Sequence, residues 1–276
     1  MTLTAAYCLP LYRLAGFAFH SDLYSHILLI PFIGVYLAYS TRDNIVQTAS
    51  PDRTAGFLLL GFGAALAVGY LAVAASGLVL QTQDYLACLI LSFVFCIAGL
   101  FGIFLGAKTL RALAFPLGFL VFMAPLPLFL EGAITDLLQE GSAATALMLF
   151  RLCGTPVFYT HLVFKLPGIL IEVAPECSGI HSSLVLFITS VLAGFFFLRS
   201  PSKRAILALV TLPLAIFRNG FRILIIGELC VRVGPDMINS YIHRRGGPFF
   251  FALSLIPFSA LLWWLWRSDR RTSQKN

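Results

Sequence analysis

The chain has 276 residues, of which 59% are hydrophobic and only 11% are charged, and its mean hydropathy is +0.91. A soluble domain of this length needs far fewer apolar residues to fill its core, so the composition excludes a soluble protein and indicates an integral membrane protein. The formal net charge of +7 does not indicate nucleic-acid binding, because the basic residues stand in short groups between apolar runs rather than in one patch.

Apolar runs long enough to cross a bilayer follow one another along the chain. About 20 helical residues are needed to span the roughly 30 Å of hydrocarbon. In chain order the candidate spans are residues 24–40, 55–76, 85–106, 112–130, 177–198, 205–230 and 248–266, with 3–19 as a weaker eighth candidate. We therefore expect an all-α fold, a polytopic transmembrane helical bundle of about 7–8 spanning helices that forms a single domain over residues 1–276.

Residues 131–176 interrupt this pattern and form the longest segment without a span. The stretch "ITDLLQEGSAATALMLFRLCG" is amphipathic, and the later "LPGILIEVAPE" is interrupted by glycine and proline. These features predict an interfacial helix followed by a strand-like or irregular loop.

The distribution of lysine and arginine over alternate connections predicts the orientation of the chain. One set of connections carries eleven such residues: Arg42, Arg53, Lys108, Arg111, Arg199, Lys203, Arg204, Arg267, Arg270, Arg271 and Lys275. The other set carries five: Arg151, Lys165, Arg232, Arg244 and Arg245. The richer set is expected in the cytoplasm. The loops 77–84, 131–176 and 231–247 then face the outside.

This orientation brings three chemically useful residues to the outer side. Cys177 begins a predicted helix there, Arg222 lies in the outer half of the next helix, and His243 lies in the following outer loop. A thiolate attacks carbonyl carbon, a guanidinium stabilises the resulting oxyanion, and an imidazole protonates the leaving amine. Together they are sufficient for acyl transfer, which needs neither a metal nor an organic cofactor.

Two arginines in one apolar helix add to this signal. Arg218 and Arg222 stand four residues apart in "FRNGFRILII", on one helical face with Asn219 between them. Guanidinium groups are costly in hydrocarbon unless they face a bundle interior, a partner or water. Arg222, near the outer end, could instead reach the lipid headgroups.

Several alternatives stay open at this point. Cys177 could form a disulfide with Cys153, since both lie on the oxidising outer side. His181, one turn after Cys177, could be the partner of the thiol in place of His243, and the spacing leaves the two histidines level. Glu176 could orient the site or simply cap the helix.

Four segments of the chain resemble a known family, the exosortase/archaeosortase membrane transpeptidases. "LPGILIEVAPECSGIHSS" is similar to the family's "leVa…CSGi" segment, and "LPLAIFRNGFRI" is similar to its Asn-x-x-Arg-Ile segment. The downstream "HRRGG" and the early "SDLYSHILLIPF", which looks like a Ser-His-x-x-Leu-x-Pro region, complete the pattern. The order of the four segments is specific, whereas any one alone is not.

The resemblance implies a catalytic triad in this chain. It makes Cys177 the nucleophile, Arg222 the arginine of the Asn-x-x-Arg motif and His243 the histidine, and so favours His243 over His181. The chain differs from the family pattern in two ways that concern basic residues. His181 stands where the family is expected to have arginine after "CSGI", and Arg218 is a second candidate for the catalytic arginine.

The resemblance also implies the substrates and the location. The expected partners are the lipid bilayer and membrane-anchored proteins with a carboxyl-terminal tripartite sorting signal: a short motif such as Pro-Glu-Pro, a transmembrane helix and a basic tail. The expected location is a bacterial inner membrane, crossed several times, with the site facing the periplasm or exterior and the acceptor unknown. Two rival functions remain: a plain cysteine protease, and a transporter or lipid-binding protein that uses Arg218 and Arg222.

Overall fold

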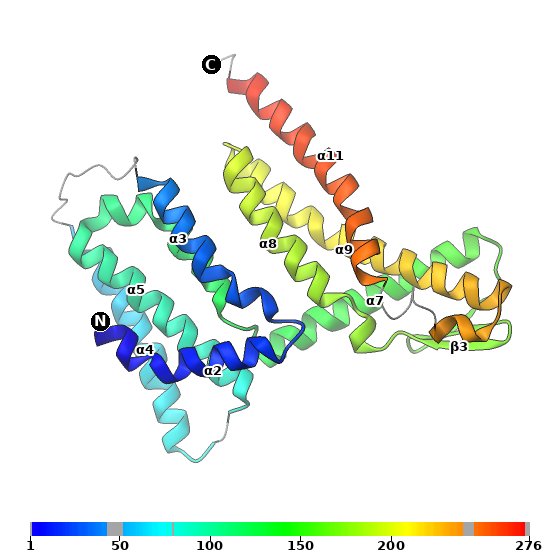
Figure 1. The fold of residues 1–276 in the computed structure, drawn as a ribbon, viewed down its shortest axis with the longest axis horizontal. Coiled ribbons are helices and arrows are strands. Elements are labelled where there is room, and N and C mark those ends of the chain that lie inside the picture. The colour runs from blue at the N-terminus through cyan, green and yellow to red at the C-terminus, as the bar shows by residue number, and fades with distance from the viewer. Residues whose placement is uncertain (1, 43–51, 79, 240–245, 274–276) are drawn as a thin grey trace. The chain divides into compact units, whose positions relative to one another are not determined.

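The computed structural model describes residues 2–42, 52–78, 80–239 and 246–273, apart from the side chains of residues 2, 176, 238–239 and 272–273. The described chain is predominantly helical, which confirms the predicted membrane-helix class (Figure 1). Five helices in these ranges are long and apolar enough to cross a bilayer, or six if one interrupted pair counts as a single span, close to the predicted number. The five are α4 (Thr54–Ala75), α5 (Thr82–Ala112), α8 (Ile180–Phe197), α9 (Pro201–Arg232) and α11 (Gly247–Ser273).

Three predicted spans are shorter or interrupted in the structure. The segments 3–19, 24–40 and 112–130 contain α1 (Thr2–Ala6), α2 (Cys8–Phe19), η1 (Ser25–Leu28), α3 (Ile30–Ser40), α6 (Ala114–Phe119) and η3 (Leu120–Met123). Pro31 stands in the first turn of α3, where its missing N–H is tolerated, so that helix starts there rather than at residue 24. Pro125 and Pro127 separate η3 from α7 (Leu128–Leu152), because proline cannot continue the helical ladder.

The chain divides into two compact units, residues 1–131 and 132–276. In the first, α4 and α5 approach closely through small residues. A Cβ on Gly63 would lie 2.7 Å from the Cys96 sulfur, and one on Gly99 would lie 2.6 Å from the backbone nitrogen of Leu60. Small residues allow helix backbones to approach in this way in membranes, where dispersion rather than water exclusion holds helices together. Cys96 is thereby part of a helix interface.

A partly buried polar cluster links separate segments of the first unit. The Tyr24 hydroxyl donates to the Glu131 carboxylate at 2.7 Å, and Gln83 donates to the Tyr24 oxygen at 3.0 Å and to the Leu126 carbonyl at 2.6 Å. Burial and the neighbouring Glu131 carboxylate raise the pKa of Tyr24. The cluster ties the segment "SDLYSHILLIPF" to the start of α7.

The second unit contains a small antiparallel sheet, which confirms the strand-like segment predicted before Cys177. Its strands are β1 (Phe158–Thr160), β2 (Val163–Leu166) and β3 (Ile169–Glu172), in the order β1-β2-β3 with Phe164 opposite Ile171. Phe164 and Ile171 pack with Phe150 of α7 and Ile223 of α9 in one buried cluster. A Cβ on Gly220 would lie 2.7 Å from Thr145 Cβ, so α9 lies directly against α7 here. The sheet therefore packs against a closely packed pair of helices, α7 and α9.

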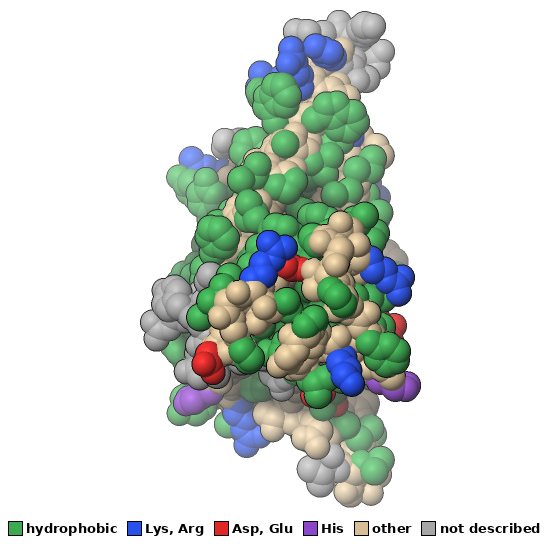
Figure 2. Space-filling model, turned by 90° about the vertical axis from the view of Figure 1, so that its right-hand side faces the viewer, with side chains coloured by type: hydrophobic (Ala, Val, Ile, Leu, Met, Phe, Trp, Pro, Cys, Tyr) green, Lys and Arg blue, Asp and Glu red, His purple; other side chains and the backbone are tan. Residues whose placement is uncertain are grey.

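Helices α8, α9 and α11 pack around a second apolar cluster in this unit. It includes Leu186, Leu207 and Phe258, one from each helix. The outer face of α11 remains apolar and exposed, with Ile256 at 67% and Trp264 at 61% exposure, as expected of a helix that faces lipid. Figure 2 shows hydrophobic side chains along this helix and basic side chains, which are arginines, at its carboxyl-terminal end.

Candidate active site

Cys177 follows the sheet in the chain and lies just before the start of α8. After β3, the Val173 N–H donates to the Leu162 carbonyl at 2.9 Å, and the Gln139 side chain donates to the Val173 carbonyl. The chain then forms the short 3-10 turn η4 (Pro175–Cys177), in which the Cys177 N–H donates to the Ala174 carbonyl at 2.8 Å. Cys177 is thus the last residue of a turn whose entrance is fixed by the sheet.

The predicted start of the spanning helix at Cys177 is wrong by three residues. Gly179 has φ of +76° and caps α8, whose first residue is Ile180. This left-handed conformation separates η4 from α8 and is readily adopted only by glycine. A Cβ at Gly179 would also lie 3.2 Å from Nη2 of Arg218. Cys177 therefore precedes the membrane helix instead of belonging to its first turn.

Asn219 of α9 holds the backbone of the cysteine itself. Its Nδ2 donates to the Cys177 carbonyl at 2.7 Å and to the Ser178 carbonyl at 3.2 Å, and the side chain is only 3% exposed. One buried amide thus satisfies two carbonyls in a turn that no helix or sheet ladder supports. Asn219 of α9, about 40 residues further along the chain, therefore fixes the backbone that carries the thiol.

Arg218 holds the next part of the same turn. Its Nη2 donates to Ser182 Oγ at 2.6 Å, with longer contacts of 3.4 Å to the Gly179 carbonyl and Ser183 Oγ. The side chain is 7% exposed, and its buried Nη1 has no hydrogen-bond partner among the described residues. The guanidinium is therefore engaged with the first turn of α8.

Arg222 takes a different place, one helical turn further along α9. It lines a pocket together with Cys177, Asn219 and Glu172, and the remaining walls are Ile171, Val173, Ile223 and Ile226. The described lining of this pocket does not include Arg218. A guanidinium and a thiol in a mostly aliphatic surrounding interact more strongly than in water. The arrangement can stabilise a thiolate, or an oxyanion formed on attack by that thiolate.

The structure describes only some of the other predicted site residues. His181 is exposed on the first turn of α8 and is not among the described residues that line the Cys177 pocket. His243 and the side chain of Glu176 lie outside the described residues. Cys153 and Cys177 are both free thiols.

Glu172 is a pocket residue that sequence reasoning missed. It ends β3, where the alternation of buried and exposed positions turns its side chain away from the buried Ile171 and Val173. It lines the same pocket as Cys177 and Arg222. The signal for it was the alternation in "ILIEV", which marks Glu172 as the exposed member of a strand directly before the cysteine turn.

Replacement of Asn219 is expected to release the cysteine turn. Asn219→Ala removes both donors and should lower stability by about 1–3 kcal/mol, and the isosteric Asn219→Asp should be at least as harmful because it sets an oxygen against two carbonyls. Thermal unfolding of the purified protein in detergent measures this. Thr189→Ala, which removes a hydrogen bond internal to α8, is the control and should change the midpoint little. Equal midpoints for Asn219→Asp and the wild type would contradict the anchoring role.

Comparison with known proteins identifies the family of the chain. A family model described as transmembrane exosortase matches residues 18–260, which include the cysteine turn, α9 and the polar cluster around Tyr24. No curated protein and no solved structure shows significant similarity to the chain. Because the match covers most of the sequence, the chain belongs to the transmembrane exosortase family.

Proposed function

We propose that this multi-pass membrane protein is a cysteine transpeptidase that removes a carboxyl-terminal sorting signal from membrane-anchored proteins and transfers them to an acceptor. The observation that carries the proposal is the shared pocket of Cys177 and Arg222, with the Cys177 carbonyl held by Asn219. A nucleophile needs a fixed position and a cation close to the charge that develops on reaction, and this pocket offers both.

The proposed reaction has two halves. The Cys177 thiolate adds to the scissile carbonyl, and Arg222 donates hydrogen bonds to the resulting oxyanion. His243 gives a proton to the departing amine, the carbon–nitrogen bond breaks, and a thioester to Cys177 remains. An amine or water then attacks the thioester, loses its proton to the histidine, and restores the thiol. Arg218 and Asn219 act as positioning residues for the cysteine turn.

The family and the pocket walls support the proposed substrate class. The pocket is mainly aliphatic and lies before the first turn of a membrane helix, where it suits an extended segment next to a transmembrane anchor. A tripartite signal of a short motif such as Pro-Glu-Pro, a helix and a basic tail presents such a segment. The basic tail and the scissile motif of that substrate would then lie on opposite sides of the membrane.

The proposed orientation places the site outside a bacterial inner membrane. Arg199, Lys203 and Arg204 lie between α8 and the first turn of α9, at the end of α8 opposite to Cys177. Arg270 and Arg271, in the last turn of α11, add to the same asymmetry. Basic connections stay in the cytoplasm, so the Cys177 end is expected on the periplasmic side.

Labelling of single cysteines in intact cells is expected to show this orientation. In a background without the native cysteines, a membrane-impermeant maleimide should label position 161 in the sheet turn, and should label position 202 only after the membrane is opened. Both positions are at least partly exposed, so access to the reagent is set by the membrane. Labelling of position 202 alone in intact cells would show the opposite topology and would contradict a periplasmic site.

The mass of the processed substrate tests the reaction itself. Co-expression with a protein that ends in a Pro-Glu-Pro-type signal should yield a product without its carboxyl-terminal helix. A product heavier than the cleaved polypeptide by an attached amine indicates transpeptidation. A free carboxylate in the presence of acceptors would instead establish a protease, and an intact substrate would contradict the proposed function.

A further inference from the structure

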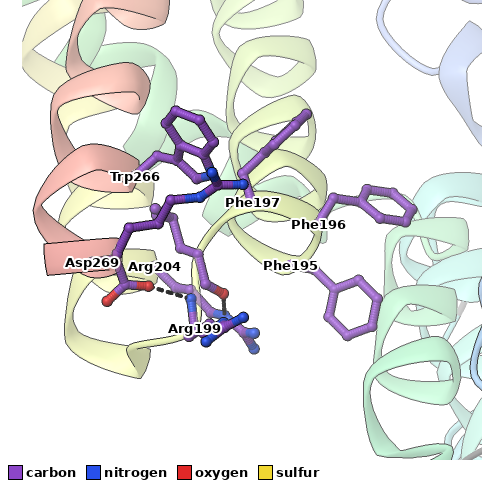
Figure 3. Close-up of a pocket in the computed structure, with 9 residues that line it drawn as sticks. Phe195, Phe196, Phe197, Arg199, Arg204, Trp266 and Asp269 are labelled. Carbon is purple, nitrogen blue, oxygen red and sulfur yellow. Dashed lines mark hydrogen bonds between the residues drawn. The ribbon is translucent and has the colours of Figure 1, made fainter. Parts of the chain in front are cut away.

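A second pocket, lined by charged and aromatic residues, lies at the other end of α8. It is lined by the three consecutive phenylalanines at the end of that helix, by residues of the connection to α9, and by the last turns of α11 (Figure 3). The described residues in its lining are Phe195, Phe196, Phe197, Leu198, Arg199, Arg204, Trp266, Asp269 and Arg270. Of these described residues, Asp269 alone is acidic, beside three arginines.

The carboxylate of Asp269 has its interaction partners within the protein. One carboxylate oxygen accepts hydrogen bonds from the backbone N–H of Arg199 at 2.6 Å and of Ser200 at 3.3 Å. The other carboxylate oxygen forms an ion pair with Lys203 at 3.2 Å, and the residue is 8% exposed. Asp269 thus binds the two residues that precede α9, close to a helix N-terminus where a negative charge is favourable, and links α11 to α9. The described lining holds three arginines and one acidic residue, which pairs with Lys203, so its formal charge is positive.

Aromatic and backbone contacts hold two of the arginine side chains in place. The Arg270 guanidinium stacks on Trp266 at 4.0 Å from the ring centre, and the Arg204 guanidinium lies 5.6 Å from the centre of Phe195. Arg204 also donates through Nε to the Leu198 carbonyl at 2.8 Å. Cations held in this way lose less side-chain freedom when they bind an anion, and guanidinium groups suit phosphate oxygens.

The surroundings decide which kind of anion fits. Phe196 and Phe197 are exposed at 50% and 55%, and Trp263 and Trp264 of α11 at 53% and 61%. Aromatic side chains next to arginines at the ends of apolar helices are typical of the headgroup level of a bilayer. A free anion would use the arginines alone, whereas a lipid would also cover the exposed phenylalanines with its acyl chains.

We propose that this pocket binds the headgroup phosphate of an anionic membrane lipid, with the acyl chains along Phe196 and Phe197, and that the bound lipid joins the ends of α8, α9 and α11. The site is separate from Cys177 and does not depend on the chemistry proposed there. Its expected effect is on the stability of the helix ends rather than on the acyl-transfer step.

Thermal unfolding in mixed micelles tests the proposal. Phosphatidylglycerol is expected to raise the midpoint of the wild type more than phosphatidylcholine does, in a saturable way. In Arg199→Gln/Arg270→Gln, the apparent affinity for phosphatidylglycerol should fall at least about tenfold, and in Arg270→Gln alone about fivefold. Both side chains are exposed, so the fold should persist.

The matched control removes the same amount of charge, in this case from α11 alone. Arg267→Gln/Arg271→Gln changes two exposed arginines of α11 that are not among the described lining residues, and it should retain the wild-type response. An equal loss in this control would show general attraction to an anionic surface and overturn the site. An equal midpoint shift with inorganic phosphate would assign the pocket to a soluble anion, and an unchanged response in Arg199→Gln/Arg270→Gln would exclude it.

Discussion

Cys177→Ala is expected to reduce substrate processing to background, whereas Cys88→Ala and Cys96→Ala should leave it nearly intact. The thiol of Cys177 shares a pocket with the Arg222 guanidinium, and alanine cannot form the thioester. Cys88 and Cys96 lie in α5, where the Cys88 thiol contacts the Leu66 carbonyl and Cys96 packs against Gly63 of α4. The measurement is the accumulation of uncleaved substrate in membranes at matched expression.

Two further variants separate a chemical from a structural role of this thiol. Cys177→Ser keeps the size and polarity of the side chain but supplies a far weaker nucleophile, so it should be as inactive as Cys177→Ala. Cys153→Ala should be active, because Cys153 is a free, exposed thiol at the end of α7. Equal loss from Cys153→Ala and Cys177→Ala would instead point to a disulfide between the two residues.

The membrane helices were predictable because length and hydropathy set them, but their ends were not. The apolar run of α8 is visible in the sequence, yet its start is shifted to Ile180 by one left-handed residue, Gly179. Likewise, the run 112–130 is apolar throughout, and Pro125 and Pro127 break it. Hydropathy averages over about 20 residues, whereas a helix ends through the conformation of one or two.

The residue types of the candidate site could be predicted from the sequence, but the contacts that each residue makes could not. Helical spacing places Arg218 and Arg222 on one face of α9 and cannot tell them apart. In the structure Arg218 binds the first turn of α8, whereas Arg222 lines the pocket with Cys177. That difference depends on which residues of the segment from Cys177 to the first turn of α8 lie opposite each arginine. The same holds for Glu172, whose place in the pocket of Cys177 depends on how the sheet packs against α9.

Arg222→Lys and His243→Ala are each expected to remove most processing activity without loss of protein. Lysine keeps the charge but not the planar, multi-donor geometry of guanidinium, and loss of an oxyanion donor costs about 100- to 1000-fold in rate. His243→Ala removes the proposed acid for the leaving amine. Arg222 lines the pocket from a position where Arg218, bound to Ser182, cannot replace it. Cleavage rates in membranes at matched expression measure both effects.

His181→Arg separates the two histidines. His181 is exposed on α8 and is not among the described residues of the Cys177 pocket, and the family resemblance places arginine at this position. Arginine cannot act as a base at neutral pH, so an active His181→Arg variant shows that the reaction does not need an imidazole there. We expect that variant to process substrate at close to the wild-type rate. Inactive His181→Arg beside active His243→Ala would make the imidazole one turn from Cys177 its true partner, and the proposed triad would be wrong.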